Sequence, residues 1–164
     1  MKLPRFLVIA VLLGLLLWSV PGFSDQPGSQ DSPHEGTAVT HEIDLSTHRW
    51  TDRLLLLFAP DTADQDYQKI VETLSQSSSQ VRERDLRLYH LFFEERGSFE
   101  DQPLSSEAAQ KLASDLGVSQ DRFTVLLVGK DGGVKMRSSD PEILEDIFAR
   151  IDSMPMRQRE MREQ

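Results

Sequence analysis

The sequence predicts an α/β domain with a four-stranded mixed sheet in the order β-α-β-α-β-β-α and helices on both faces. Short apolar runs alternate with segments whose apolar residues recur at helical spacing. The early runs are joined by connections long enough for a crossover helix, which favours parallel strands, and the last two by a tight turn, which gives an antiparallel pair. The 164 residues suffice for one domain with its own core.

The first half of the domain is predicted to form strand, helix and strand. Arg53–Ala59 is apolar at almost every position, as expected of a strand buried on both faces. A helix follows, with Thr62 at the cap position of a capping box, and the serine cluster at residues 75–79 ends it. Leu86–Phe93 is the second strand, with aromatic side chains on both faces.

The second half completes the predicted sheet. The predicted elements are an acidic loop at Glu94–Pro103, a helix from Ser105 to Gly117, a strand at Phe123–Val128, a turn at Lys130–Gly133, an edge strand at Val134–Arg137 and a helix opened by Asp140 and Pro141. Gly117 suits the end of the first of these helices, and Pro141 suits the first position of the second. The Asp-Gly pair of the turn tolerates positive φ. This succession is the thioredoxin-like topology.

The beginning of the chain is typical of a targeting segment. Lys2 and Arg5 precede an apolar run at residues 6–20, and Gly22 and Ser24 are small residues at the positions that signal peptidase reads. We therefore expect a signal peptide at 1–24 and a periplasmic or secreted protein, with an uncleaved anchor as the alternative. A flexible acidic linker at 25–42, the thioredoxin-like domain at 43–156 and a charged tail at 157–164 are expected to follow.

Composition excludes several classes of function. The chain has no cysteine, so it is not a thiol-disulfide oxidoreductase or a thiol peroxidase. Its net charge of −9 disfavours nucleic acid as a partner. No second long apolar stretch follows the targeting segment, so no stable membrane anchor is expected after cleavage.

Three segments resemble a known family. They are Arg49-Trp50 followed by Arg53–Pro60, then Phe123–Lys135 with its GKDGGVK motif, and Met154–Arg157. Over Thr47–Met161 the chain is similar to the bacterial secreted family classed as domain-of-unknown-function family 4174. Animal relatives of that family occur in sushi-repeat-containing and extracellular-matrix proteins, as domains described as peroxiredoxin-like. The resemblance implies a thioredoxin-like fold and an extracytoplasmic location, and it supplies no activity.

The loop after the first strand is where thioredoxin-like folds carry their chemistry. Here it contains Pro60, Asp61, Thr62 and Asp64, followed by Asp66. The aspartates could ligate a divalent cation because carboxylates are hard oxygen ligands. They lack the spacing of a calcium loop, and aspartates in the first turn of a helix routinely offset its dipole, which is the favoured interpretation.

The C-terminal segment is the most basic stretch of an acidic chain. Its candidate partner-binding residues are Met154, Met156, Arg157, Arg159 and Arg162. Thioethers can bind cuprous copper or form an adaptable apolar surface for a protein. A solvated helical extension of the last helix is the third interpretation.

These observations predict a non-catalytic protein-binding or adaptor module with a protein partner and no cofactor. The alternative is a metal-binding protein or a non-thiol enzyme that uses the Asp61, Asp64 and Asp66 loop or the C-terminal methionines.

Overall fold

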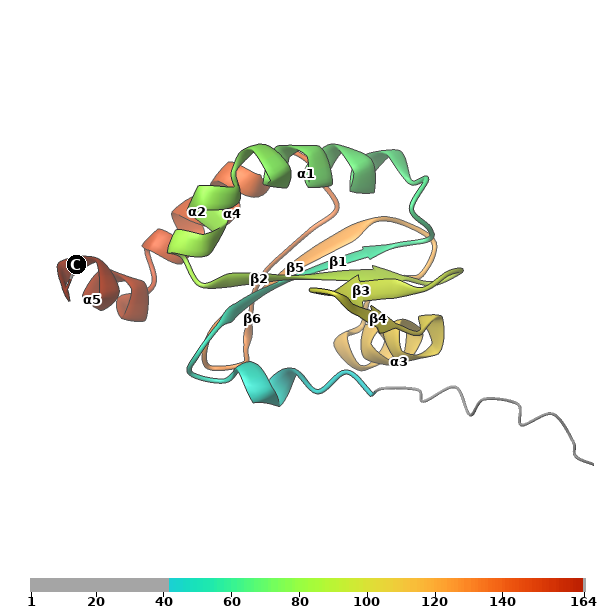
Figure 1. The fold of residues 1–164 in the computed structure, drawn as a ribbon, viewed down its shortest axis with the longest axis horizontal. Coiled ribbons are helices and arrows are strands. Elements are labelled where there is room, and N and C mark those ends of the chain that lie inside the picture. Colours follow the sequence, from blue (N-terminus) through green and yellow to red (C-terminus); the bar gives the residue numbers. More distant parts are fainter. Residues whose placement is uncertain (1–41, 164) are drawn as a thin grey trace, which may run out of the picture. The chain divides into compact units, whose positions relative to one another are not determined.

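Strand β1 (Arg53–Ala59) lies inside a six-stranded sheet with the order β4-β3-β2-β1-β5-β6 (Figure 1). The computed structural model describes residues 42–163. The predicted signal peptide and the predicted linker up to residue 41 lie outside this range. Within the described range, no helix has the length and the apolar character that a membrane crossing requires.

The sheet has two strands more than the four predicted. Strand β2 (Leu86–Phe92) pairs with β3 (Gly97–Phe99), which pairs with β4 (Gln102–Leu104), and both short strands fall in the stretch predicted as an acidic loop. Three-residue strands that contain Gly97 and Pro103 carry no alternating apolar pattern. Glycine is required in β3 because a Cβ at residue 97 would lie 2.0 Å from the His90 carbonyl oxygen.

The pairing of β1 confirms one predicted orientation and corrects another. β1 and β2 are parallel, as the crossover helix predicts. Strand β5 (Thr124–Val128) is antiparallel to β1, with Thr124 opposite Phe58. The chain that follows the helix at Ser106–Leu116 enters β5 at the end of the sheet where β1 and β2 finish. Strand β5 therefore runs back along β1 in the opposite direction. Strand β6 (Val134–Ser138) is antiparallel to β5, as predicted.

Helices cover both faces of the sheet (Figure 1). Helices α1 (Gln65–Gln76), α2 (Ser78–Glu83) and α4 (Leu144–Asp152) cover one face, and α3 (Ser106–Leu116) with the short helix η1 (Leu45–His48) covers the other. All seven β1 residues are buried, as predicted: Leu55 and Leu57 point to the first face, Leu54 and Leu56 to the second. Alternation along a strand sends successive side chains to opposite layers.

Local polar groups set the helix ends, not always where predicted. Ser105 caps α3, and Gly117 ends it at φ 63°, as predicted. The cap of α1 is Asp64, whereas Thr62 was predicted. Helix α4 begins at Leu144 and not at Asp140, because the Asp140 carboxylate accepts the Glu142 N–H at 2.9 Å and holds a separate turn.

The C-terminal residues form a further helix, α5 (Pro155–Glu163), beyond α4 (Figure 1). The predicted boundary between the domain and a charged tail, at 156/157, falls inside this helix. Arg157 is 1% exposed, so the helix is fixed to the rest of the domain by a buried charged side chain.

Candidate functional site

The loop between β1 and α1 contains the predicted Pro60, Asp61, Thr62 and Asp64. The Asp61 carboxylate accepts the Ala63 N–H at 2.8 Å, and that of Asp64 accepts the Tyr67 N–H at 2.9 Å. The Thr62 N–H donates to the Glu95 carboxylate. The Asp61 and Asp64 carboxylates therefore accept hydrogen bonds from backbone N–H groups.

The same loop is tied to the strand beside it, and it offers no assembled metal site. The Pro60 carbonyl accepts the N–H groups of Phe93 at 3.2 Å and Glu94 at 3.0 Å. Among residues 42–163, no three histidine, cysteine, aspartate or glutamate side chains gather closely enough to hold a metal ion.

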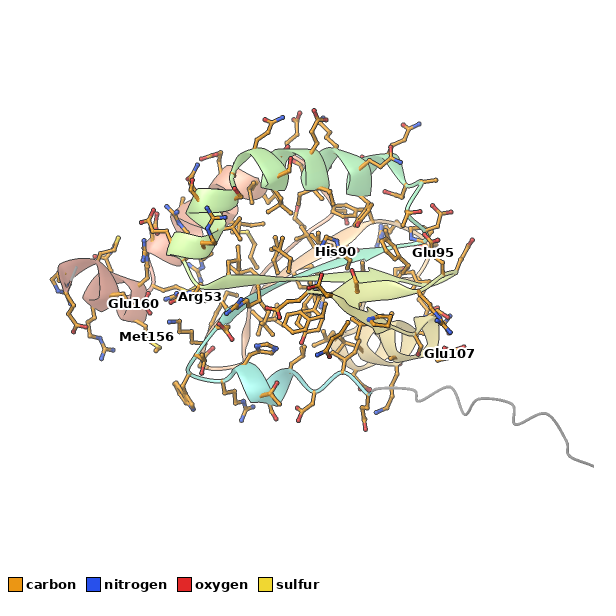
Figure 2. All side chains as sticks on the ribbon, in the orientation of Figure 1. Arg53, His90, Glu95, Glu107, Met156 and Glu160 are labelled. Atoms are coloured by element: carbon orange, nitrogen blue, oxygen red, sulfur yellow. The ribbon has the colours of Figure 1, made fainter. Side chains whose placement is uncertain are left out.

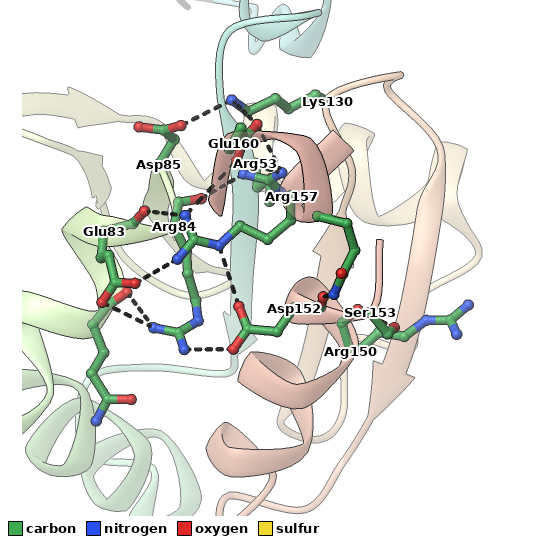
Figure 3. Close-up of polar contacts among 12 residues, drawn as sticks. Arg53, Glu83, Arg84, Asp85, Lys130, Arg150, Asp152, Ser153, Arg157 and Glu160 are labelled. Atoms are coloured by element: carbon green, nitrogen blue, oxygen red, sulfur yellow. Dashed lines mark hydrogen bonds and ion pairs between the residues drawn. The ribbon is translucent and has the colours of Figure 1, made fainter. Parts of the chain in front are cut away.

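A cluster of charged side chains lies at the opposite end of β1, where α5 meets the domain (Figures 2 and 3). It brings together the three buried arginines of the described residues, one lysine and their acidic partners, from four elements (β1, α2, α4 and α5) and two loops. We call it the charge cluster; its members are Arg53, Arg84, Lys130, Arg157, Glu83, Asp85, Asp152 and Glu160.

Arg53 and Lys130 hold Glu160 of α5. Arg53 Nη2 lies 3.1 Å from both Glu160 carboxylate oxygens, and its Nη1 donates to the Arg84 carbonyl at 2.9 Å. Lys130 Nζ lies 2.9 Å from Glu160 and 2.9 Å from Asp85. Arg53 is only 1% exposed, so this ion pair is shielded from water on the arginine side.

Arg157 joins α5 to α2 and α4. Its guanidinium contacts Glu83 at 2.5 Å and Asp152 at 3.3 Å, and it also donates to the Glu83 carbonyl at 2.9 Å. Arg84 reaches the same Asp152 at 2.6 Å and lies 4.7 Å above the Phe148 ring. Since Arg157 is internal, it is not a free contact residue for a partner in this structure.

The other predicted C-terminal residues lie at the surface or beside a cavity. Met154 and Met156 are half-buried and line one cavity next to Lys130. Arg159 and Arg162 are exposed. The structure thus separates the predicted set into an internal arginine, two cavity methionines and two surface arginines.

The charge cluster shifts the pKa of its own members. Burial acts to raise the pKa of Glu160, but the hydrogen bond from Lys130 and the charge of Arg53 outweigh it, and the pKa lies below its ordinary value. Burial acts to lower the pKa of Lys130, and its hydrogen bonds to Glu160 and Asp85 raise it above the ordinary value. Both groups are therefore held in the charged state.

Because the pKa of Glu160 is lowered in the folded protein, its contribution to the free energy of unfolding is expected to depend on pH. The Glu160→Gln variant is expected to be less stable than the wild type above the unfolded-state pKa of about 4.3, with the difference shrinking as the pH falls through the lower folded-state pKa. Chemical denaturation between neutral pH and pH 3 measures it. Glu163→Gln, an exposed change on the same helix, is the control; a difference for Glu160→Gln that persists at pH 3 would contradict the assignment.

A second polar network joins η1 to the sheet. His48 Nδ1 lies 3.0 Å from Asp52, and its Nε2 lies 2.9 Å from the Tyr89 hydroxyl. A carboxylate, an imidazole and a hydroxyl in this order resemble a catalytic relay. Burial raises the pKa of Tyr89 to about 12, with nearby acidic side chains adding to the shift, so the phenol keeps its proton at neutral pH.

Trp50 is the most exposed of the large apolar side chains in the described part of the chain, at 68%. Its backbone lies in the left-handed region at φ 68°, which is unusual for a bulky residue. Its N–H donates to the Lys130 carbonyl at 2.7 Å, which fixes it beside the β5–β6 turn. Val134, on the far side of that turn, is 43% exposed. We call Trp50, Val134 and the adjoining exposed Arg49 the hairpin surface.

Sequence reasoning missed both the charge cluster and the hairpin surface. The Arg49-Trp50 pair and the turn are conspicuous in the sequence, but nothing there indicates that the tryptophan points to solvent. Figure 2 places Arg53, Met156 and Glu160 at the same end of the domain and Glu95 at the other. The candidate site is therefore at the end of the sheet opposite the predicted loop.

Comparison with curated proteins finds similar segments in larger animal proteins. Sushi repeat-containing protein SRPX2 of Xenopus laevis is 30% identical over 112 residues, which cover 66% of this chain and 24% of that protein. Coiled-coil domain-containing protein 80 of Danio rerio is 29% identical over 133 residues, or 71% of this chain and 15% of that protein. The chain thus matches about a quarter or less of each relative's length.

Comparison with solved structures confirms the thioredoxin-like fold. Plasmodium yoelii thioredoxin peroxidase I is 17% identical with a TM-score of 0.53, covering 71% of this chain and 80% of that chain. The reduced 2-Cys peroxiredoxin of Plasmodium vivax is 15% identical with a TM-score of 0.53, covering 71% and 72%. At this identity the likeness concerns the fold alone.

The family itself is shown by sequence. The family described as domain of unknown function (DUF4174) matches residues 44–160, which include the whole sheet, the hairpin surface and the charge cluster. The resemblance seen in the sequence is therefore confirmed: this cysteine-free chain of thioredoxin-like fold belongs to the DUF4174 family.

Proposed function

We propose that the chain is an exported, non-catalytic protein-binding domain whose contact surface is centred on Trp50. The observation that carries this is a tryptophan that is 68% exposed while its backbone is held at φ 68°. For a residue other than glycine, the left-handed conformation costs on the order of 1 kcal/mol. Because the Trp50 side chain is exposed, its packing within the chain offsets little of this conformational cost. Tryptophan is enriched among the residues that contribute most of the binding energy at protein interfaces.

The surroundings of Trp50 support contact with a protein. Val134 adds a second exposed apolar side chain across the turn. Arg49 adds a cation, and no acidic side chain among the described residues lies within 4 Å of its guanidinium. Buried aromatic and arginine anchors with a polar rim are the usual composition of a protein interface.

The β1–α1 loop supports the non-catalytic part of the proposal. The chain has no thiol, and the loop's Thr62 and Ala63 N–H groups already donate to the Glu95 and Asp61 carboxylates, while the Tyr67 N–H in the first turn of α1 donates to Asp64. A loop whose main-chain donors are occupied is poorly suited to stabilise a developing negative charge on a substrate.

Site-specific crosslinking in the producing organism tests the proposal. A photoreactive amino acid replacing Val134 is expected to yield one discrete covalent adduct with a protein, reduced at least about tenfold when Trp50→Ala is added, because a central tryptophan contributes about 2 kcal/mol or more to binding. The same photoreactive residue replacing the exposed Glu72 of α1 is the control. The same adducts from both positions, or an adduct indifferent to Trp50, would contradict the proposal.

A further inference from the structure

A groove of about 300 Å³ lies beside strand β2, where helices α1 and α2 cover the strand incompletely. Leu88 and His90 of β2 form its floor, and both are half-buried. They are two residues apart on the strand, so their side chains point to the same face of the sheet, the one that carries α1 and α2. Figure 2 shows His90 on this side of the sheet.

The walls of the groove are mostly apolar. Val71 and Leu74 come from α1 and Val81 from α2, and the hydroxyls of Ser75 and Ser78 lie between them. An apolar lining with a few polar groups is typical of small-molecule sites. A water molecule takes about 30 Å³, and a methylene group takes nearly as much, so the groove holds on the order of ten such groups. An aliphatic chain of about eight carbons with a small polar end therefore fits.

Arg82 gives the lining a cation whose donors are free. It is exposed in the last turn of α2, and the lining contains no carboxylate. Among residues 42–163, no acidic side chain lies within 4 Å of its guanidinium, whereas Arg84, two residues on, is paired with Asp152. A guanidinium has five N–H donors in a fork that matches a carboxylate. In a chain of net charge −9, a free arginine beside an apolar groove favours an anionic ligand.

His90 adds a second free nitrogen on the floor. Its Nδ1 lies 2.9 Å from the hydroxyl of Tyr67, which packs edge-on against Phe92 on the side of His90 away from Leu88. The two ring nitrogens point in diverging directions, so Nε2 faces away from Tyr67 and towards the groove. In the described part of the chain Nε2 has no hydrogen-bond partner, and it is not fully buried.

The charge on the groove is confined to one end at neutral pH. Burial lowers the pKa of His90, so its imidazole is neutral. Arg82 also borders Leu86 at the beginning of β2, whereas His90 lies four residues further along the strand. The groove thus has a cation at one end, apolar side chains in the middle and an uncharged imidazole at the other end. An amphiphile with a negative end matches this arrangement.

We propose that this groove binds a free medium-chain aliphatic carboxylate, of about eight carbons. The carboxylate accepts hydrogen bonds from Arg82, and the chain contacts Val71, Leu74 and Leu88. The site lies on the face covered by α1 and α2 and involves none of the residues of the hairpin surface, so it does not depend on the proposed function.

Titration with sodium octanoate, followed by methyl NMR of the purified protein, tests the site. The methyl signals of Val71, Leu74 and Leu88 are expected to shift saturably, with a dissociation constant on the order of 0.1 mM. Octylammonium chloride has the same chain and the opposite charge. It is expected to bind at least about tenfold more weakly, because its ammonium group meets the Arg82 cation.

Two arginine variants test the contact with the carboxylate. Arg82→Gln should weaken octanoate binding at least about fivefold, while Arg122→Gln, at an exposed arginine outside the groove, should not. The spectra also report whether each variant is folded. The proposal is overturned if none of the three methyl signals saturates, if octylammonium binds as tightly as octanoate, or if the two variants bind octanoate equally. Crosslinking from position 134 is unaffected by any of these outcomes.

Discussion

Replacing Arg53 with alanine is expected to lower the free energy of unfolding by about 3 kcal/mol, as for other ion pairs with a buried partner. The change removes the forked contact to Glu160 and the hydrogen bond to the Arg84 carbonyl, both made by a side chain that is 1% exposed. It also leaves a space where the guanidinium lay. Urea denaturation followed by circular dichroism measures the loss.

Arg159→Ala is the matched control for this prediction. Arg159 lies on α5, the helix that carries Glu160; it is exposed, and its side chain makes only a 3.4 Å contact to the Pro155 carbonyl. Its replacement is expected to change the free energy of unfolding by less than about 0.5 kcal/mol. If the two variants lost equal stability, or Arg53→Ala lost less than about 1 kcal/mol, α5 would not be held by the charge cluster.

Replacing Trp50 with glycine is expected to weaken binding to the crosslinked partner about 30-fold without lowering stability. The loss corresponds to about 2 kcal/mol, typical of a central aromatic side chain. Glycine adopts φ 68° without steric strain, and this relief offsets the extra entropy of the unfolded chain. Calorimetric titration of the purified partner and chemical denaturation give the two quantities. Val71→Ala, on the opposite side of the domain, should leave the affinity unchanged.

The parts of the fold that could be predicted were those with strong local patterns. Strand β1 is apolar at nearly every position, and α3 carries both of its end signals, Ser105 and Gly117, so each was placed correctly. The β3–β4 pair was missed because each strand has three residues and its pairing depends on the edge of β2. The direction of β5 was also missed, since the chain's path after α3 is a tertiary feature.

The candidate site could be predicted only in part. The sequence singles out the C-terminal segment, but an arginine among charged neighbours is normally expected to be solvated, and Arg157 is 1% exposed. Its partner Glu83 is 74 residues away, and Glu160 is 107 residues from Arg53, so no local pattern links them. Trp50 was missed for the opposite reason, because a tryptophan next to an apolar strand is normally expected in the core.

The most direct test of the proposed function is crosslinking from position 134 in a chain that carries Trp50→Gly. Since the variant relieves backbone strain, loss of the adduct cannot be attributed to unfolding when denaturation shows undiminished stability. A contact role for Trp50 predicts that the adduct disappears while the free energy of unfolding is unchanged or higher. A retained adduct together with a loss of more than about 1 kcal/mol of stability would contradict that role and make Trp50 a structural residue.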